Sequence, residues 1–204
     1  MRTSTFLYVL AATGSAYAIS CSSLGSGATD TVSGQFTLSA HKTATGTTSP
    51  LHVLNAYTEP MASYDILSTG SGTASGFSAF TLTNGALTGV PPNQYLAPLN
   101  FIGLDAPPSP TALYPEPAPW LLFSNVAGTQ AVFCAVPDPA GTGNTILALN
   151  GYTNLFSLCQ SSFYSFYTDS ALLFNASSTA VNDNWNTYDG SSCVPVTTVL
   201  VPSS

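Results

Sequence analysis

The sequence predicts an all-β fold, a single-domain antiparallel β-sandwich or barrel with two disulfides. Short stretches rich in Val, Ile, Thr, Phe and Tyr recur along the chain at spacings of roughly ten residues. Clusters of Gly, Pro, Asn and Ser separate these stretches, and no helical period lies between them. Four cysteines, an even number, predict the disulfides.

The strand predictions follow the chain in order. Residues 35–40 alternate polar and apolar side chains at period two, as a half-buried strand does. Asn84-Gly85 predicts a tight hairpin turn because both residues tolerate positive φ, and the Pro- and Gly-rich residues 137–144 predict another turn. We expect further strands at 51–57, 63–67, 79–83, 86–88, 119–124, 131–136, 145–149, 155–159, 163–167 and 171–174.

One domain is expected over residues 19–204, because this length is enough to bury a core. The prolines in mid-chain predict a long surface loop near 105–119. A linker between two domains is the weaker interpretation, since too few strand patterns lie on each side for two cores. The Gly- and Ser-rich residues 70–76 are expected to form a flexible loop.

Residues 1–18 have the features of a signal peptide. A short basic start is followed by an apolar run at 6–12 and then by Ala16-Tyr17-Ala18, small residues at the spacing that signal peptidase requires. We expect cleavage after Ala18 and a protein secreted to the extracellular space. Later apolar stretches fall short of the roughly 20 residues that span a membrane.

Positive charge is nearly absent. Arg2 and Lys42 are the only Arg and Lys, and the formal net charge is -7 at pH 7. Nucleic acids and anionic membranes are bound mainly by Lys and Arg that neutralise phosphates, so we expect neither as a partner. Hydroxyls, amides and sugars are expected to hydrate the surface.

Two disulfides are the expectation for the cysteines of an exported chain, which are Cys21, Cys134, Cys159 and Cys193. We favour Cys134 with Cys159, which closes a short loop, and Cys21 with Cys193, which ties the chain ends. The sequence alone leaves the three pairings open.

Catalytic motifs are missing from the sequence, which contains no Gly-x-Ser-x-Gly elbow, His-Glu-x-x-His helix or phosphate-binding glycine loop. We therefore expect no enzyme, no cofactor and no metal. The cysteines form no Cys-x-x-Cys pair, and His41 and His52 lie far from them. A hydrolase that recruits His52, Glu59 and Asp65 is a weaker hypothesis, and we favour His52 as an ordinary strand residue.

A polar cluster near the C-terminus is the strongest candidate for a binding site. Sugar sites use Asp and Asn to bond hydroxyls and an aromatic ring to cover the sugar face. The same oxygens suit Ca²⁺, although their spacing does not match an EF-hand. We favour a surface turn and keep glycan binding as the alternative. The candidate residues are Asp183, Asn184, Trp185, Tyr188 and Asp189.

Two segments are expected to carry sugars. Asn175-Ala176-Ser177 is the only Asn-x-Ser/Thr acceptor, so Asn175 is the predicted N-glycosylation site. The hydroxyl-rich residues 43–50 are typical of O-glycosylated stretches.

Three segments resemble the C-terminal four-cysteine domain of fungal Pir-type cell-wall glycoproteins: FTLTNGALT (80–88), CQSSFYSFYTDS (159–170) and CVPV (193–196). SPLHVLN (49–55) is similar to a segment of PhiA-type wall proteins. The glutamine repeats that attach Pir-type proteins to wall glucan are absent and the cysteine spacing is wider, so neither covalent attachment nor a catalytic residue carries over.

These features predict a secreted, non-catalytic structural or interaction glycoprotein of the fungal cell wall or extracellular matrix. Wall polysaccharide or wall proteins are its expected partners. The alternative is a lectin-like glycan-binding module that uses Trp185 and Tyr188.

Overall fold

The computed structural model describes residues 20–58, 62–70, 77–92, 99–104, 121–124, 132–160, 170–180 and 188–203. The predicted signal peptide at 1–18, the proline-rich loop near 105–119, the predicted strand at 163–167 and nearly all of the loop at 70–76 lie outside these residues.

The described residues form strands and two short 3₁₀ helices, η1 (Cys21–Leu24) and η2 (Gly190–Ser192). All strand pairings are antiparallel, which confirms the predicted all-β antiparallel class. The strands are β1 (Val32–Lys42), β2 (Thr47–Thr58), β3 (Ala62–Ser68), β4 (Ala79–Thr83), β5 (Ala86–Val90), β6 (Leu99–Leu104), β7 (Leu121–Ser124), β8 (Phe133–Pro137), β9 (Thr145–Leu149), β10 (Phe156–Gln160), β11 (Ser170–Phe174), β12 (Val194–Pro195) and β13 (Thr197–Pro202).

Three strands, β6, β12 and β13, were not predicted from the sequence. Prolines in the C-terminal tail hide β12 and β13, yet Pro195 and Pro202 each stand at the last position of a strand. A proline is tolerated at a strand end or on an edge, where its missing N–H breaks no ladder bond. β6 shows no regular alternation of polar and apolar residues, so period-two analysis does not find it.

The predicted turn at Asn84-Gly85 joins β4 to β5, with φ values of 50° and 77°. Asn150-Gly151, which the sequence analysis did not single out, has similar φ values of 50° and 86° and returns the chain after β9. Both turns use the positive φ that Asn and Gly accept most readily.

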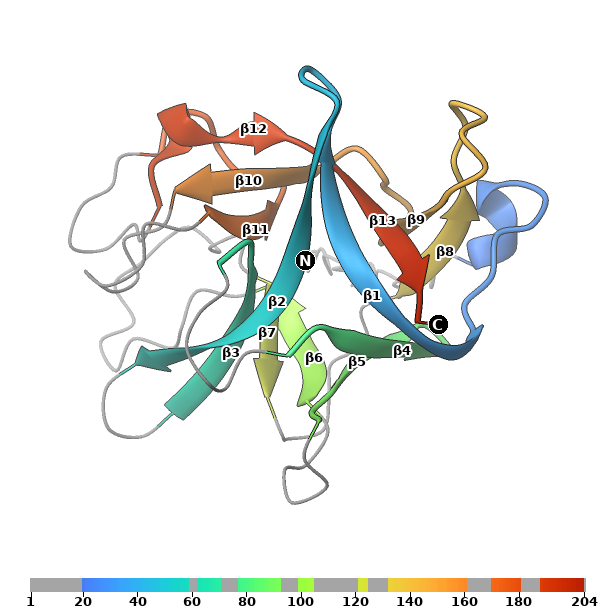
Figure 1. Ribbon diagram of the computed structural model, residues 1–204, viewed down its shortest axis with the longest axis horizontal. Helices are drawn as coiled ribbons and strands as arrows, with labels where there is room; N and C mark the ends of the chain where they lie inside the picture. The colour runs from blue at the N-terminus through green and yellow to red at the C-terminus, as the bar shows by residue number, and fades with distance from the viewer. Residues whose placement is uncertain are drawn as a thin grey trace, which may run out of the picture.

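All strands join in one sheet that runs from β12 at one end to β8 at the other (Figure 1). Within it, β2 pairs with both β1 and β3, so pairing also returns from β3 to β1 by way of β2. Because the sheet as a whole is open, the more specific prediction of a sandwich or barrel is not confirmed.

The two ends of the open sheet offer little backbone for a further strand. At β8, Ala135 exchanges two backbone hydrogen bonds of 2.8 and 2.9 Å with Thr29, and Phe133 donates to the carbonyl of Gly85. At the other end, β12 is two residues long and includes Pro195. Short, covered or proline-bearing edges limit unwanted strand addition.

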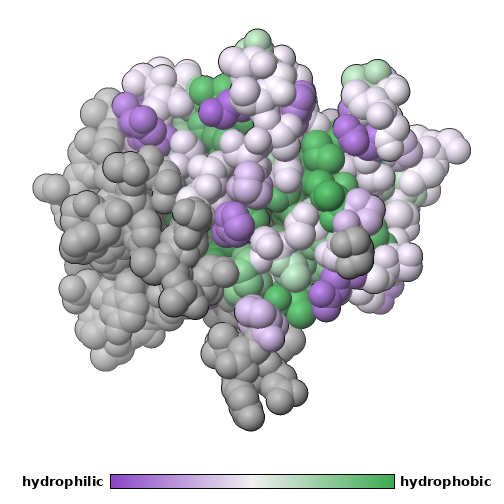
Figure 2. Space-filling view, viewed as in Figure 1, coloured by the Kyte–Doolittle hydropathy of each residue, from purple (hydrophilic) through white to green (hydrophobic). Residues whose placement is uncertain are grey.

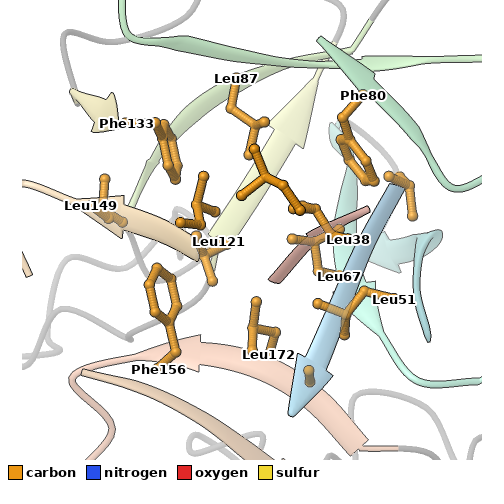
Figure 3. Close-up of a cluster of buried hydrophobic side chains, with 14 of the residues drawn as sticks. Leu38, Leu51, Leu67, Phe80, Leu87, Leu121, Phe133, Leu149, Phe156 and Leu172 are labelled. Carbon is orange, nitrogen blue, oxygen red and sulfur yellow. The ribbon is translucent and has the colours of Figure 1, made fainter. Parts of the chain in front are cut away.

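A central cluster of buried apolar side chains holds the fold together. It draws on eleven of the strands and includes Phe36, Phe80, Phe123, Phe133 and Phe156 among its largest members. Figure 3 shows members of this cluster, among them Phe80, Phe133 and Phe156, converging from strands that are distant in sequence. Ring pairs such as Phe156 with Phe174, 5.2 Å apart, add edge-to-face contacts to the buried area.

Two hairpins are buried on both faces. In β8–β9, Phe133 and Leu147 face the central cluster, whereas Cys134 and Ile146 belong to a second cluster on the opposite face. Helix η1 covers that opposite face, and the Cys21–Cys134 disulfide attaches it. Alternation along each strand explains the arrangement, since neighbouring residues point to opposite faces.

The hairpin β10–β11 repeats this plan. Its outer apolar cluster contains Ile66, Cys159, Ala171, Leu173 and Tyr188. The segment that covers it, which we call the outer strap, consists of residues 175–180 and 188–193 in the described part of the chain. The Cys159–Cys193 disulfide attaches this strap to β10.

The favoured pairing of Cys134 with Cys159 and of Cys21 with Cys193 is therefore wrong. Cys134 lies on β8 at one end of the sheet, and Cys159 lies on β10, next to the other end. A short sequence separation does not bring them together, because the chain crosses the sheet between β9 and β10. Cys134 instead bonds to Cys21 in the segment that covers β8–β9, and Cys159 bonds to Cys193 in the strap that covers β10–β11.

Thr198 is an exception inside the apolar core. It is fully buried on β13 between Val196 and Leu200, which belong to the central cluster, and opposite Ala40 of β1. In the described part of the chain its hydroxyl has no hydrogen-bond partner. Burial of an unpaired hydroxyl costs about 1–3 kcal/mol.

We expect Thr198→Val to raise the free energy of unfolding by about 1 kcal/mol, because valine has the same shape without the unpaired hydroxyl. Urea denaturation of the disulfide-intact protein measures the change. Thr197→Val is the matched control, since Thr197 is only partly buried and points to the other face of β13. A loss of stability in Thr198→Val alone would contradict the prediction.

Candidate functional site

The predicted glycan-binding cluster is described only at its C-terminal end. Asp183, Asn184 and Trp185 lie outside the described residues. Tyr188 is only 4% exposed and packs in the outer cluster on β10–β11. Its hydroxyl accepts a hydrogen bond of 3.1 Å from the Ser177 N–H. The ring of Tyr188 is thus not a surface on which a sugar can stack, and this part of the alternative hypothesis is corrected.

Asp189 caps helix η2. Its Oδ1 accepts hydrogen bonds from the N–H and the hydroxyl of Ser191, at 2.9 and 2.7 Å. Asp residues favour this position because the carboxylate satisfies N–H groups that the helix leaves free. Asp189 therefore shapes the turn before Cys193, as the surface-turn interpretation expected.

Strand geometry places two residues of the hydrolase hypothesis, His52 and Asp65. Leu51 and Val53 face the central cluster, so His52 points to the opposite face of β2. Asp65 lies two residues before Leu67, another member of the central cluster, so it points to the core side of β3. The two side chains are on opposite faces of the sheet. Glu59, the third residue of the hypothesis, lies outside the described residues.

His41 lies at the end of β1, where its Nδ1 is 3.0 Å from the hydroxyl oxygen of Thr48 on β2. Within the described ranges, no three His, Cys, Asp or Glu side chains gather closely enough to hold a metal ion. A membrane-spanning helix is likewise not found among the described residues.

The turn predicted over 137–144 is organised by Asp138. Its N–H bonds to the carbonyl of Asn144 at 2.9 Å, and its carboxylate accepts from the Thr142 hydroxyl and from the Ala140 N–H. The hydrogen bond from Thr142, then that from Ala140, holds the pKa of Asp138 below its ordinary value, and the charge of His41 acts in the same direction. Asp138 serves as a structural carboxylate in this turn.

A groove of about 520 Å³ lies beside β4 and β5. Five of the seven residues that line it are apolar, and the others supply one amide and one hydroxyl side chain. The sequence analysis singled out none of them as a candidate functional residue. The Pro-Pro pair directly after β5 is the sequence feature that marks it. The lining residues are Gln35, Phe77, Ser78, Ala79, Val90, Pro91 and Pro92.

The predicted acceptor Asn175 begins the outer strap, directly after β11. Its side chain is exposed, its φ is 56°, and its N–H bonds to the carbonyl of Leu155 at 2.7 Å. Ala176 packs against the outer cluster. The acceptor carboxamide is thus on the surface, while the residue after it is part of the packed fold.

On the front of the molecule, the described residues are mostly of intermediate hydropathy, with small hydrophilic and hydrophobic patches (Figure 2). β1, β2 and β13 cross this side in Figure 1. Thr37, Thr48 and Thr197 point outward from these strands, so hydroxyls supply much of the polarity. This agrees with a chain in which only 5% of residues are charged.

No family model, curated protein or solved structure matches the chain. A functional assignment therefore depends on its residues and their geometry.

Close packing of the outer strap on itself leads to a prediction at Gly190. A Cβ at this position would lie 2.3 Å from the carbonyl oxygen of Ser177 and 2.7 Å from the backbone nitrogen of Ala180. We expect Gly190→Ala to lower the free energy of unfolding by roughly 3 kcal/mol, because backbone atoms must move to make room. Urea denaturation measures this change.

Gly46→Ala is the control for Gly190→Ala. Gly46 has a φ of 70° and no neighbouring atom within 4 Å of the added Cβ, so only backbone strain of about 1 kcal/mol is expected. Equal losses in the two variants would show that the strap does not pack as described.

Proposed function

We propose that this chain is an extracellular structural or interaction glycoprotein of the fungal cell wall or matrix, acting without catalysis. The observation that carries the proposal is the pair of disulfides, Cys21–Cys134 and Cys159–Cys193. Two disulfides fit an oxidising environment, since cytosolic thiols are kept reduced. Each one attaches a covering segment to a hairpin, so both support the durable shell that a wall component needs.

The surface supports the same proposal. Exposed hydroxyls, an exposed acceptor at Asn175 and few charges suit a protein hydrated by hydroxyls and attached sugars. Thr43, Thr45 and Thr47 are exposed at the tip of the β1–β2 hairpin, where O-linked sugars are also proposed. The resemblance to Pir-type and PhiA-type wall proteins supports wall polysaccharide or wall proteins as partners.

Expression in a fungal host tests the proposal. We expect the protein in the medium or wall fraction, with Ile19 as its N-terminus and with lower mass after removal of N-linked sugars. Non-reducing peptide mapping should recover linked peptides for Cys21–Cys134 and for Cys159–Cys193. Cytosolic protein that retains residues 1–18 and has free thiols would overturn it.

Glycan binding remains the alternative function, and it now depends on Trp185 without the ring of Tyr188. Pull-down on chitin, β-glucan and mannan separates the two proposals. Binding that is lost in Trp185→Ala and kept in Tyr152→Ala supports the lectin-like module, because Tyr152 is an aromatic residue 53% exposed elsewhere on the surface. No binding of the wild type to any of the three polysaccharides supports the structural role.

A further inference from the structure

The acceptor sequence at 175–177 is part of the folded strap and not an open loop. The N–H, the carbonyl and the hydroxyl of Ser177 each have a hydrogen-bond partner inside the strap. Its N–H donates to the Tyr188 hydroxyl at 3.1 Å, its carbonyl accepts from the Ala180 N–H at 3.3 Å, and its hydroxyl lies 3.0 Å from that of Thr179. The Thr179 N–H also donates to the Ser177 hydroxyl oxygen, at 3.3 Å.

This engagement affects glycosylation because the acceptor motif requires a hydroxyl residue two positions after the asparagine. A transferase that demands this hydroxyl has to reach it together with the asparagine carboxamide. In the folded strap Asn175 and Ser177 are both exposed, but the Ser177 hydroxyl lies 3.0 Å from that of Thr179, the Ser177 N–H is bonded to Tyr188, and Ala176 is packed against the outer cluster. The finished fold therefore has room for a glycan on Asn175, but hydrogen bonds from the Asn175 and Ser177 N–H groups hold the backbone of the acceptor segment in one conformation.

Three contacts hold the acceptor segment closed, and all come from the C-terminal part of the strap. Tyr188 bonds to Ser177, as described above. Gly190 donates to the carbonyl of Ala180 at 2.8 Å and is so close that even a Cβ would collide with Ser177. Cys193 attaches this part of the strap to Cys159, on the same hairpin whose outer face the strap covers.

We propose that formation of the Cys159–Cys193 disulfide ends the period in which Asn175 can be glycosylated, so the sugar is added first and the strap closes afterwards. This rests on the proposed extracellular glycoprotein. In the transfer step, Asn175 Nδ2 bonds to C1 of a lipid-linked oligosaccharide diphosphate. The bond from C1 to the diphosphate oxygen breaks, and an amide proton passes to a base of the transferase.

The order is tested on protein made without glycan and then given to oligosaccharyltransferase membranes with the lipid-linked donor. The compared proteins are the wild type, the double variant Cys159→Ser/Cys193→Ser and the matched control Cys21→Ser/Cys134→Ser. The control removes the other disulfide and leaves the strap attached. We expect the Cys159/Cys193 variant to be modified at least about tenfold faster than the other two, because only its strap opens locally.

Tyr188→Phe provides a second measurement with both disulfides intact. It removes the hydrogen bond to Ser177 while keeping the packed ring, so we expect a modification rate above that of the wild type and below that of the Cys159/Cys193 variant. Asn175→Gln should abolish modification in every background.

Equal rates in the wild type and the Cys159/Cys193 variant would overturn the inference. Equally fast modification of the Cys21/Cys134 control would do so too, since general loosening would then explain the effect. A synthetic peptide of residues 170–180 separates this from failure of the proposed glycoprotein. If the peptide is modified but the wild type and the Cys159/Cys193 variant have equal rates, only the proposed order is overturned. If the peptide is not modified, the proposed glycosylation of Asn175 is overturned as well.

Discussion

Burial of both faces of two hairpins is the constraint on which the rest of this structure depends. β8–β9 and β10–β11 present one face to the central cluster, and each has a second apolar face that must also leave water. Exposure of apolar side chains to water is unfavourable, so each of these outer faces has to be covered. The N-terminal helix η1 covers one outer face and the outer strap covers the other.

The covering segments explain why the disulfides stand where they do. η1 is four residues long and η2 is three residues long, so neither element has much regular structure to hold it in place. A covalent bond to the hairpin beneath reduces the number of conformations that each segment can adopt when it detaches. The Cys21–Cys134 and Cys159–Cys193 bonds thus perform the same task on opposite parts of the sheet.

The polar groups described in the outer strap form hydrogen bonds that stabilise the fold. The Ser177 N–H donates to the Tyr188 hydroxyl, and the Asp189 carboxylate accepts from the Ser191 N–H, so these contacts stay within the strap. The Asp138 carboxylate accepts from the Ala140 N–H in the same way, in the turn after β8. Residue types that form sugar sites also form turns, because Asp, Asn, Ser and Tyr offer the same hydrogen-bonding groups in both settings. Burial decides between the two uses, and burial depends on what the rest of the chain places above the residue.

By itself, the sequence determined the all-β class, most strand positions, the turn at Asn84-Gly85 and the presence of two disulfides, because these depend on local alternation, turn chemistry and cysteine number. Only the tertiary structure decided which cysteines pair, which side of β2 and β3 carries His52 and Asp65, and whether Tyr188 is exposed. Those outcomes depend on the order of strands in the sheet and on which segment covers each face. Contacts between residues far apart in the chain set both, and no local pattern records them.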